Sequence, residues 1–198
     1  MKIPPAAPGD PEAHLRLASI LWDYYQFDGA ANAIAEARRR TADPLRFADK
    51  LAAVYESRRD YPHAVAEYVR LAAADPPSSF EGERRDEERS YDESGEPGSY
   101  SPEANGTSNP LERLQFLARR KGQADNINKA FLAEHERDPQ AAGPVKAYAA
   151  YLRARGDDAA HERFLLAVVG RQTSLPVLDG LGDGSLLPLG KAERTVRL

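Results

Sequence analysis

The sequence contains no cysteine among its 198 residues and no long apolar run. Without thiols, a disulfide framework, a thiolate zinc site and a cysteine nucleophile are all excluded. The apolar runs fall far short of the roughly 20 residues that a transmembrane helix needs. With 41% hydrophobic and 29% charged residues, the composition is typical of a soluble protein. The first residues lack the apolar core of a secretory signal, so we expect a cytoplasmic protein.

Negative charge is concentrated in one segment, although the net charge of the chain is only −4. Residues 77–109 carry nine acidic and three basic side chains, together with many serines, glycines and prolines. A segment so poor in apolar residues cannot bury enough surface to offset the entropy that ordering costs. We therefore predict a disordered acidic insertion at residues 79–107.

A regular repeat organises the rest of the chain. One offset aligns Leu17 with Leu51 in the first half, and the same offset aligns Leu114 with Tyr148 in the second. A longer offset, equal to one period plus the acidic insertion, aligns Leu51 with Leu114. A fixed period in this range is the sequence signature of a repeat architecture. The alignment predicts four units, at residues 11–44, 45–78, 108–141 and 142–175.

Each unit contains two segments in which apolar residues recur three or four positions apart, as on one face of a helix. Asp10-Pro11, Asp43-Pro44 and Asn109-Pro110 each place a capping oxygen before a proline at the first helical position. Gly122 and Gly156 follow basic turns, as expected of left-handed residues that end helices. Because no segment shows clear strand alternation, the sequence predicts an all-α chain of helix–turn–helix units.

The second unit resembles the tetratricopeptide repeat (TPR) most closely. The resemblance is carried by Leu51-Ala52, Tyr55, Tyr61, Ala64, Tyr68 and Asp75-Pro76. It covers the four units, which make up most of the chain, and it implies a right-handed superhelical solenoid of antiparallel helix pairs. Glu134 and His161 depart from the pattern, so the third and fourth units are degenerate.

The resulting domain organisation has five parts. They are a flexible N-terminal arm at 1–10, two TPR-like helix pairs at 11–78, the acidic insertion at 79–107, two further pairs at 108–175, and a Gly/Leu/Pro-rich C-terminal tail at 176–198. Closing the inserted loop costs about 3 kcal/mol, which one or two buried side chains offset, so we expect the second and third units to stack. No capping helix follows the fourth unit. Three explanations stay open: the tail covers that end, the end self-associates, or the array continues in a longer protein.

The TPR resemblance also implies a binding groove lined by the first helix of each pair. The residues predicted to contact a partner there are Leu15, Ser19, Trp22, Asp49, Ala53, Glu56, Phe116, Arg119, Lys146 and Arg153. Trp22 and Phe116 are aromatic anchor candidates, and packing of each against a neighbouring helix is the alternative. The groove is acidic in the first two units and basic in the last two. Such a surface suits an extended peptide or helix with apolar anchors and opposite charges at its ends.

The sequence offers no convincing catalytic or metal-binding motif. His135-Glu136 and His161-Glu162 resemble the start of a metalloprotease helix, but Pro139 and Leu165 stand where the second histidine would be. The glycine-rich residues 180–184 lack the spacing of a dinucleotide-binding loop, and no serine occupies a nucleophile elbow. We therefore expect no enzyme activity, no metal and no cofactor.

Basic clusters at residues 38–40, 58–59 and 119–121 give the best case for nucleic acid. Each cluster ends a predicted helix, however, where cations complement the helix dipole, and a pI near 5.7 opposes duplex binding. The expected function is therefore a non-catalytic scaffold or adaptor whose partner is a protein or peptide, with neither nucleic acid nor membrane as a partner. The alternative is an assembly or oligomerisation segment of a larger TPR-containing complex.

Overall fold

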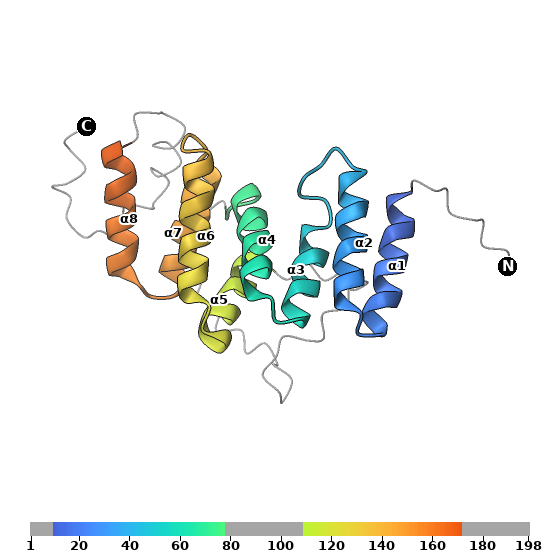
Figure 1. Ribbon diagram of the computed structural model, residues 1–198. Coiled ribbons are helices and arrows are strands. Elements are labelled where there is room, and N and C mark those ends of the chain that lie inside the picture. The colour runs from blue at the N-terminus through green and yellow to red at the C-terminus, as the bar shows by residue number, and fades with distance from the viewer. Residues whose placement is uncertain (1–9, 78–108, 172–198) are drawn as a thin grey trace. The chain divides into compact units, whose positions relative to one another are not determined.

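The computed structural model describes residues 10–77 and 109–171, and its regular secondary structure in these ranges is entirely helical (Figure 1). The helices are α1 (Pro11–Asp23), α2 (Phe27–Arg39), α3 (Ala48–Ser57), α4 (Tyr61–Ala74), α5 (Pro110–Lys121), α6 (Ala124–Arg137), α7 (Ala142–Ala154) and α8 (Asp158–Arg171). Over these ranges the all-α prediction is confirmed. The predicted arm except for Asp10, the acidic insertion and the C-terminal tail lie outside the described residues. Every helix in the two ranges falls short of the length and apolarity that crossing a membrane requires.

The chain divides into two compact units. Within the described residues, the first unit comprises residues 10–71 and 109–127, and the second comprises residues 72–77 and 128–171. Among the described residues, the first unit therefore contains α1, α2, α3, most of α4, α5 and the start of α6. The second contains the end of α4, the rest of α6, α7 and α8.

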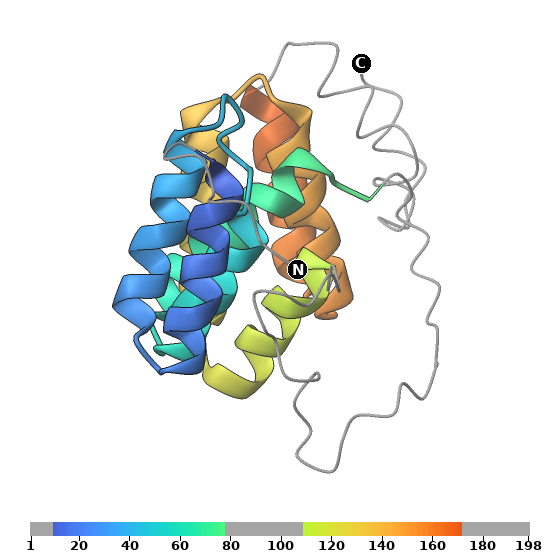
Figure 2. The same ribbon diagram turned by 90° about the vertical axis from the view of Figure 1, so that its right-hand side faces the viewer.

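The core of the first unit lies between α1, α2 and α3. Small residues of α1 and α2 bring these two helices close together, and both views show them side by side (Figures 1 and 2). Leu51 and Val54 of α3 complete the same buried cluster. The other buried members are Ala18, Ala30, Ala31, Ala33 and Ile34. Alanine at the helix contacts explains how a core with few large side chains excludes water.

The core of the second unit combines an aliphatic cluster of α7 and α8 (Val145, Ala149, Leu165 and Val168) with contacts between aromatic rings. The Phe131 ring of α6 stacks on Tyr148 of α7, with 5.0 Å between the ring centroids. Tyr148 also meets Phe164 of α8 edge to face at 4.7 Å. Near the start of α7, an added Cβ on Gly143 would lie 2.1 Å from the carbonyl oxygen of Ala73 in α4. Only glycine permits this close approach of two backbones.

The turn after the first helix of each hairpin contains one residue in the left-handed backbone conformation, always at the same position of the repeat. Tyr25, Arg59, Gly122 and Gly156 all have φ between 58° and 72°. The steps from each of these residues to the next equal the offsets that align the sequence with itself. The prediction that Gly122 and Gly156 are left-handed is confirmed, whereas Tyr25 and Arg59 adopt the same conformation without the freedom of glycine.

The predicted helix starts are confirmed at two of the three Asx-Pro sites. The side chains of Asp10 and Asn109 accept hydrogen bonds from the backbone N–H groups of Glu12 and Leu111, at 3.0 Å in both cases. The prediction at Asp43-Pro44 is wrong, since the next helix, α3, begins only at Ala48. Residues 43–47 instead form a turn that ends in the left-handed Phe47.

Candidate partner-binding surface

The three residues predicted to bind a partner from α1 lie on the side of the helix that faces the first-unit core. Leu15 and Trp22 are partly buried and pack against the cluster of α1, α2 and α3. Trp22 meets the ring of Phe27 edge to face, with 5.5 Å between the centroids. Ser19 is buried. Trp22 therefore packs on a neighbouring helix, which is the second of the two roles that the sequence leaves open for it.

The residues predicted on α3 differ from one another in their environment. Asp49 is half-buried, but Ala53 is almost completely buried. The Glu56 carboxylate is paired with the guanidinium of Arg113 on α5, whose Nε donates to Oε2 at 2.8 Å and whose Nη2 donates to Oε1. Both side chains are only slightly exposed, at 11% for Glu56 and 10% for Arg113. Glu56 therefore joins α3 to α5 inside the first unit.

The pairing of Glu56 with Arg113 has a clear electrostatic signature. Burial acts to lower the pKa of Arg113, but the hydrogen bonds and the negative charge of Glu56 outweigh it, so the pKa is raised overall. The Tyr68 hydroxyl of α4 also donates to Glu56 Oε2, at 3.3 Å. A charge that is satisfied in this way has little capacity left for a partner.

On α5, Phe116 is half-buried, and two cations of the same helix lie over its ring. The Arg113 guanidinium lies 4.6 Å and the Lys121 ammonium 5.9 Å from the centre of its ring. Arg119 and Arg120, in the last turn of α5, are exposed. Because the Arg113 guanidinium is already paired with Glu56, a ligand carboxylate at this end of α5 would meet the exposed charges of Arg119 and Arg120.

In the second unit, the two predicted residues are Lys146 and Arg153 of α7. Two helical turns separate them, so they share one face of the helix, and both are half-buried. The positive charge of Arg153 contributes, after burial, to lowering the pKa of His161 on α8. Five predicted residues therefore keep exposed polar or aromatic surface: Asp49, Phe116, Arg119, Lys146 and Arg153.

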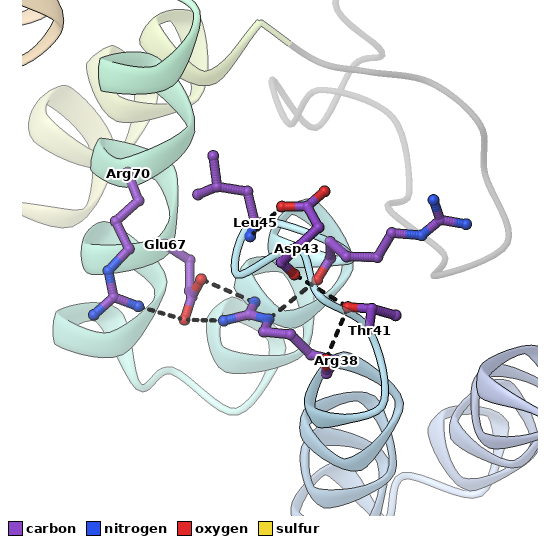
Figure 3. Close-up of polar contacts among 7 residues, drawn as sticks. Arg38, Thr41, Asp43, Leu45, Glu67 and Arg70 are labelled. Atoms are coloured by element: carbon purple, nitrogen blue, oxygen red, sulfur yellow. Dashed lines mark hydrogen bonds and ion pairs between the residues drawn. The ribbon is translucent and has the colours of Figure 1, made fainter. Parts of the chain in front are cut away.

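The basic cluster at the end of α2 is occupied by ion pairs. The Arg38 guanidinium donates to both oxygens of Glu67 on α4, at 3.2 and 3.0 Å, and its Nε donates to the carbonyl oxygen of Arg46 at 3.1 Å (Figure 3). Arg70 donates to the same carboxylate at 3.2 Å. Arg39 and Arg40 both hydrogen-bond to Glu36, which lowers the pKa of this carboxyl group.

This polar cluster also explains why α3 starts late. The carbonyl of Arg46 points to Arg38, while the Asp43 side chain accepts a hydrogen bond from Leu45 N–H at 2.8 Å (Figure 3). The Thr41 hydroxyl lies 2.8 Å from the carbonyl oxygen of Arg38. The segment is therefore held as a turn over the end of α2, and helical hydrogen bonding begins only after it.

Sequence reasoning missed the Glu67 and Arg113 ion pairs. The sequence does contain a signal for the ion pair of Glu67, because Glu67 occupies the repeat position that is Ala33 and Ala130 in two other units. A charged side chain at a position that is small elsewhere in a repeat is expected to have a specific partner when it is buried. The sequence did not indicate which cation that partner is, because Arg38 belongs to a different hairpin.

Nothing in these ranges provides an evident centre for metal chemistry. Residues 10–77 and 109–171 contain no group of three or more His, Asp or Glu side chains that could hold a metal ion. His135 and His161 belong to the second unit: His135 meets Phe164 edge to face at 6.3 Å, and His161 is buried. Comparison of the chain with protein-family models, curated proteins and solved structures gave no match.

Proposed function

We propose that the chain is a non-catalytic scaffold or adaptor of the TPR type, which binds a peptide or a helix along the first helices of its four hairpins. The recurring left-handed turn at Tyr25, Arg59, Gly122 and Gly156 is the observation that supports this proposal. One turn repeated at the sequence period gives α1, α3, α5 and α7 equivalent roles. In repeat proteins, such equivalent helices form extended binding surfaces.

The exposed chemistry of these helices favours an acidic ligand with an apolar anchor. In the first unit, Phe116 of α5 offers the aromatic contact and Arg119 offers positive charge, and in the second unit Lys146 and Arg153 of α7 offer positive charge. Because Glu56 is paired within the chain, the acidic end of the predicted groove is reduced mainly to Asp49. The preferred ligand therefore carries acidic residues beside an aromatic or aliphatic side chain, and it need not carry a basic end.

Selection from a displayed library of random peptides, followed by titration of the enriched peptides, tests this proposal. Enriched sequences should combine Asp or Glu with a large apolar residue. Phe116→Ala and Arg119→Glu should each weaken their binding about tenfold, since truncation of an interface anchor costs on the order of 1–2 kcal/mol. Arg163→Glu on α8 is the matched charge-reversal control and should leave binding unchanged. No enrichment, or equal loss in the control, would contradict the proposal.

The alternative is that the chain is an assembly segment of a larger TPR-containing complex. The observation in its favour is a row of exposed apolar side chains along α1, formed by Leu17, Ile20 and Tyr24. An assembly role predicts that binding of displayed peptides is absent while association through that row is retained.

A further inference from the structure

The outer face of α1 carries an exposed apolar row. Ala13, Leu17, Ile20 and Tyr24 are spaced by four, three and four positions, so they lie along one side of the helix. Leu17, Ile20 and Tyr24 are 47%, 55% and 70% exposed. This row is on the side of α1 opposite to Leu15, Ser19 and Trp22.

The two central positions of the row, those of Leu17 and Ile20, are buried in each of the other first helices, whereas the Tyr24 position is the exposed Arg58 in the second hairpin. Leu17 corresponds in register to Leu51, Leu114 and Tyr148, and Ile20 corresponds to Val54, Leu117 and Tyr151; none of these six is more than 7% exposed. Where their packing is described, the second helix of the preceding hairpin covers them. Leu51 and Val54 pack with residues of α2, and Tyr148 and Tyr151 pack on Phe131 of α6. The centre of the row, Leu17 and Ile20, is thus a surface of the kind that a helix covers in the other hairpins.

We propose that the α1 row binds the same row of a second copy of the chain, with the two helices antiparallel. In this arrangement Leu17 faces Ile20 of the other copy, and Ala13 faces Tyr24. Placing the smallest side chain opposite the largest fills the contact evenly, whereas a parallel pair would place Tyr24 against Tyr24. This antiparallel fit in size is the first reason to choose a second copy as the occupant.

Charge complementarity is the second reason. Arg16 and Asp23 both lie on the same border of the row, two helical turns apart, and both are exposed. In an antiparallel pair of helices, residues at this border position face one another across the contact. Arg16 of each copy then meets Asp23 of the other, which gives two symmetric ion pairs. Within its own chain Arg16 makes an exposed contact with Asp10, at 3.5 Å, which is easily exchanged.

The size of the row sets the strength of the dimer. Four side chains from each copy would bury roughly 1,000 Å² in total, which is at the low end for a specific interface. We therefore expect a reversible dimer that forms over the micromolar range. This proposal does not depend on the peptide-binding proposal, because the residues whose variants test peptide binding, Phe116 and Arg119, lie on α5.

Analytical ultracentrifugation of the full chain across a range of concentrations tests the association. The native chain should pass from monomer to dimer, and Ile20→Lys should weaken the dimer at least about 30-fold, because each copy would bury an unpaired ammonium. Leu132→Lys, at a leucine of α6 that is 42% exposed, is the matched control and should leave the dimer unchanged. A native chain that stays monomeric at about 1 mM overturns the proposal and leaves the row to another protein.

A charge exchange tests the predicted register. Arg16→Asp alone and Asp23→Arg alone should each weaken the dimer about tenfold at low salt, because each places like charges opposite one another. The double variant Arg16→Asp/Asp23→Arg should recover to within about threefold of the native chain, since opposite charges face one another again. Failure of the double variant to recover would overturn the antiparallel register.

Cysteine cross-linking tests the orientation independently, and the chain has no cysteine of its own to interfere. A mixture of Leu17→Cys and Ile20→Cys chains should oxidise mainly to the mixed disulfide, since these positions face one another in the antiparallel pair. Predominant disulfides between identical chains would indicate a parallel pair and overturn the proposal. Measuring peptide binding and dimerisation of Phe116→Ala and Ile20→Lys separates the two proposals. Phe116→Ala should lose peptide binding but keep the dimer, and Ile20→Lys should lose the dimer but keep peptide binding.

Discussion

The two units of this chain use the same helix–turn–helix hairpin but fill its interior with different chemistry. In the first unit, nearly buried ion pairs, Arg38 with Glu67 and Glu56 with Arg113, join its helices around a core rich in alanine. In the second unit, the Phe131 ring stacks on Tyr148, and Tyr148 meets Phe164 edge to face. The difference teaches that the same hairpin geometry accommodates either buried ion pairs or packed aromatic rings in its interior.

One pair of equivalent residues makes this contrast concrete. Tyr68 and Phe131 occupy the same register, and both are almost completely buried. The Tyr68 hydroxyl donates to Glu56, whereas Phe131 has no hydroxyl and stacks on Tyr148. Buried ion pairs and hydrogen bonds give specific pairing, but they require charged groups to lose their water. Aromatic packing buries apolar surface without that cost.

The largest expected effect comes from removing a ring of the second unit. Phe131→Ala should lower the free energy of unfolding of α7 by about 3–5 kcal/mol, because it leaves a cavity beside Tyr148 and Tyr151. Phe131→Leu, which keeps most of the volume, should cost less than about 1.5 kcal/mol. Hydrogen exchange of the α7 amides measures both. An equal cost for the two variants would contradict the dominance of the aromatic stack.

Breaking an ion pair of the first unit should be nearly as costly, whereas replacing the pair should not be. Arg113→Leu leaves the Glu56 carboxylate buried without its cation and should cost about 3 kcal/mol. Glu56→Leu/Arg113→Leu removes both charges and should return to within about 1 kcal/mol of the native chain. The fluorescence of Trp22, the single tryptophan of the chain, reports unfolding of the first unit. If the double variant is less stable than Arg113→Leu, the ion pair itself stabilises the unit.

A smaller effect is expected at the turns, where the two units also differ. Tyr25→Gly in the first unit should stabilise by up to about 1 kcal/mol, because glycine relieves the left-handed strain of tyrosine. Gly156→Ala in the second unit should destabilise by about 1 kcal/mol, since no atom lies near the added Cβ and only the backbone conformation is penalised. Urea unfolding measures both changes. The same sign for the two variants would mean that the turns are not equivalent.

The smallest expected effect is a difference between the units in the pH range over which they lose stability. Burial, assisted by Arg153 and opposed by Asp158, lowers the pKa of His161 below its usual value near 6.5. The unfolded chain therefore binds a proton before the folded chain does, so this contribution to stability is complete above pH 6.5 and is lost as the pH falls through the folded-state pKa. In the first unit, the pKa of Asp60 is lowered by its hydrogen bond to His63, so its contribution persists until the pH falls below about 4.

The matched variant for this prediction is His161→Leu, because the equivalent position of the preceding hairpin is the buried Ile127. Hydrogen exchange of α8 between pH 7.5 and pH 5 should show a loss of stability in the native chain and little loss in the variant. The α1 and α2 amides should show no such change over this range. A pH dependence that persists in His161→Leu would assign it to another group.

Much of the local structure follows from the sequence alone. The repeat period and the glycines at 122 and 156 predict the helix pairs and their turns, because these depend on spacing and on local backbone sterics. The caps at Asp10 and Asn109 are predicted for the same reason, since each involves only residues two positions apart. At Asp43 the same local hydrogen bond forms, to Leu45 N–H, but no helix follows it, because Arg38 binds the carbonyl of Arg46 and holds the segment as a turn.

The candidate surface depends far more on the tertiary structure. The sequence places Glu56 and Trp22 on first helices, but it does not reveal that Glu56 is paired with a residue of another hairpin or that Trp22 rests on Phe27. Nor does it distinguish Leu17 from Leu51, which share one register and differ only in whether a helix covers them. The periodic pattern determined which side of each helix is apolar. Which of those sides are covered, and which charges are neutralised, was decided only by packing, because burial and pairing arise from neighbours that are distant in the sequence.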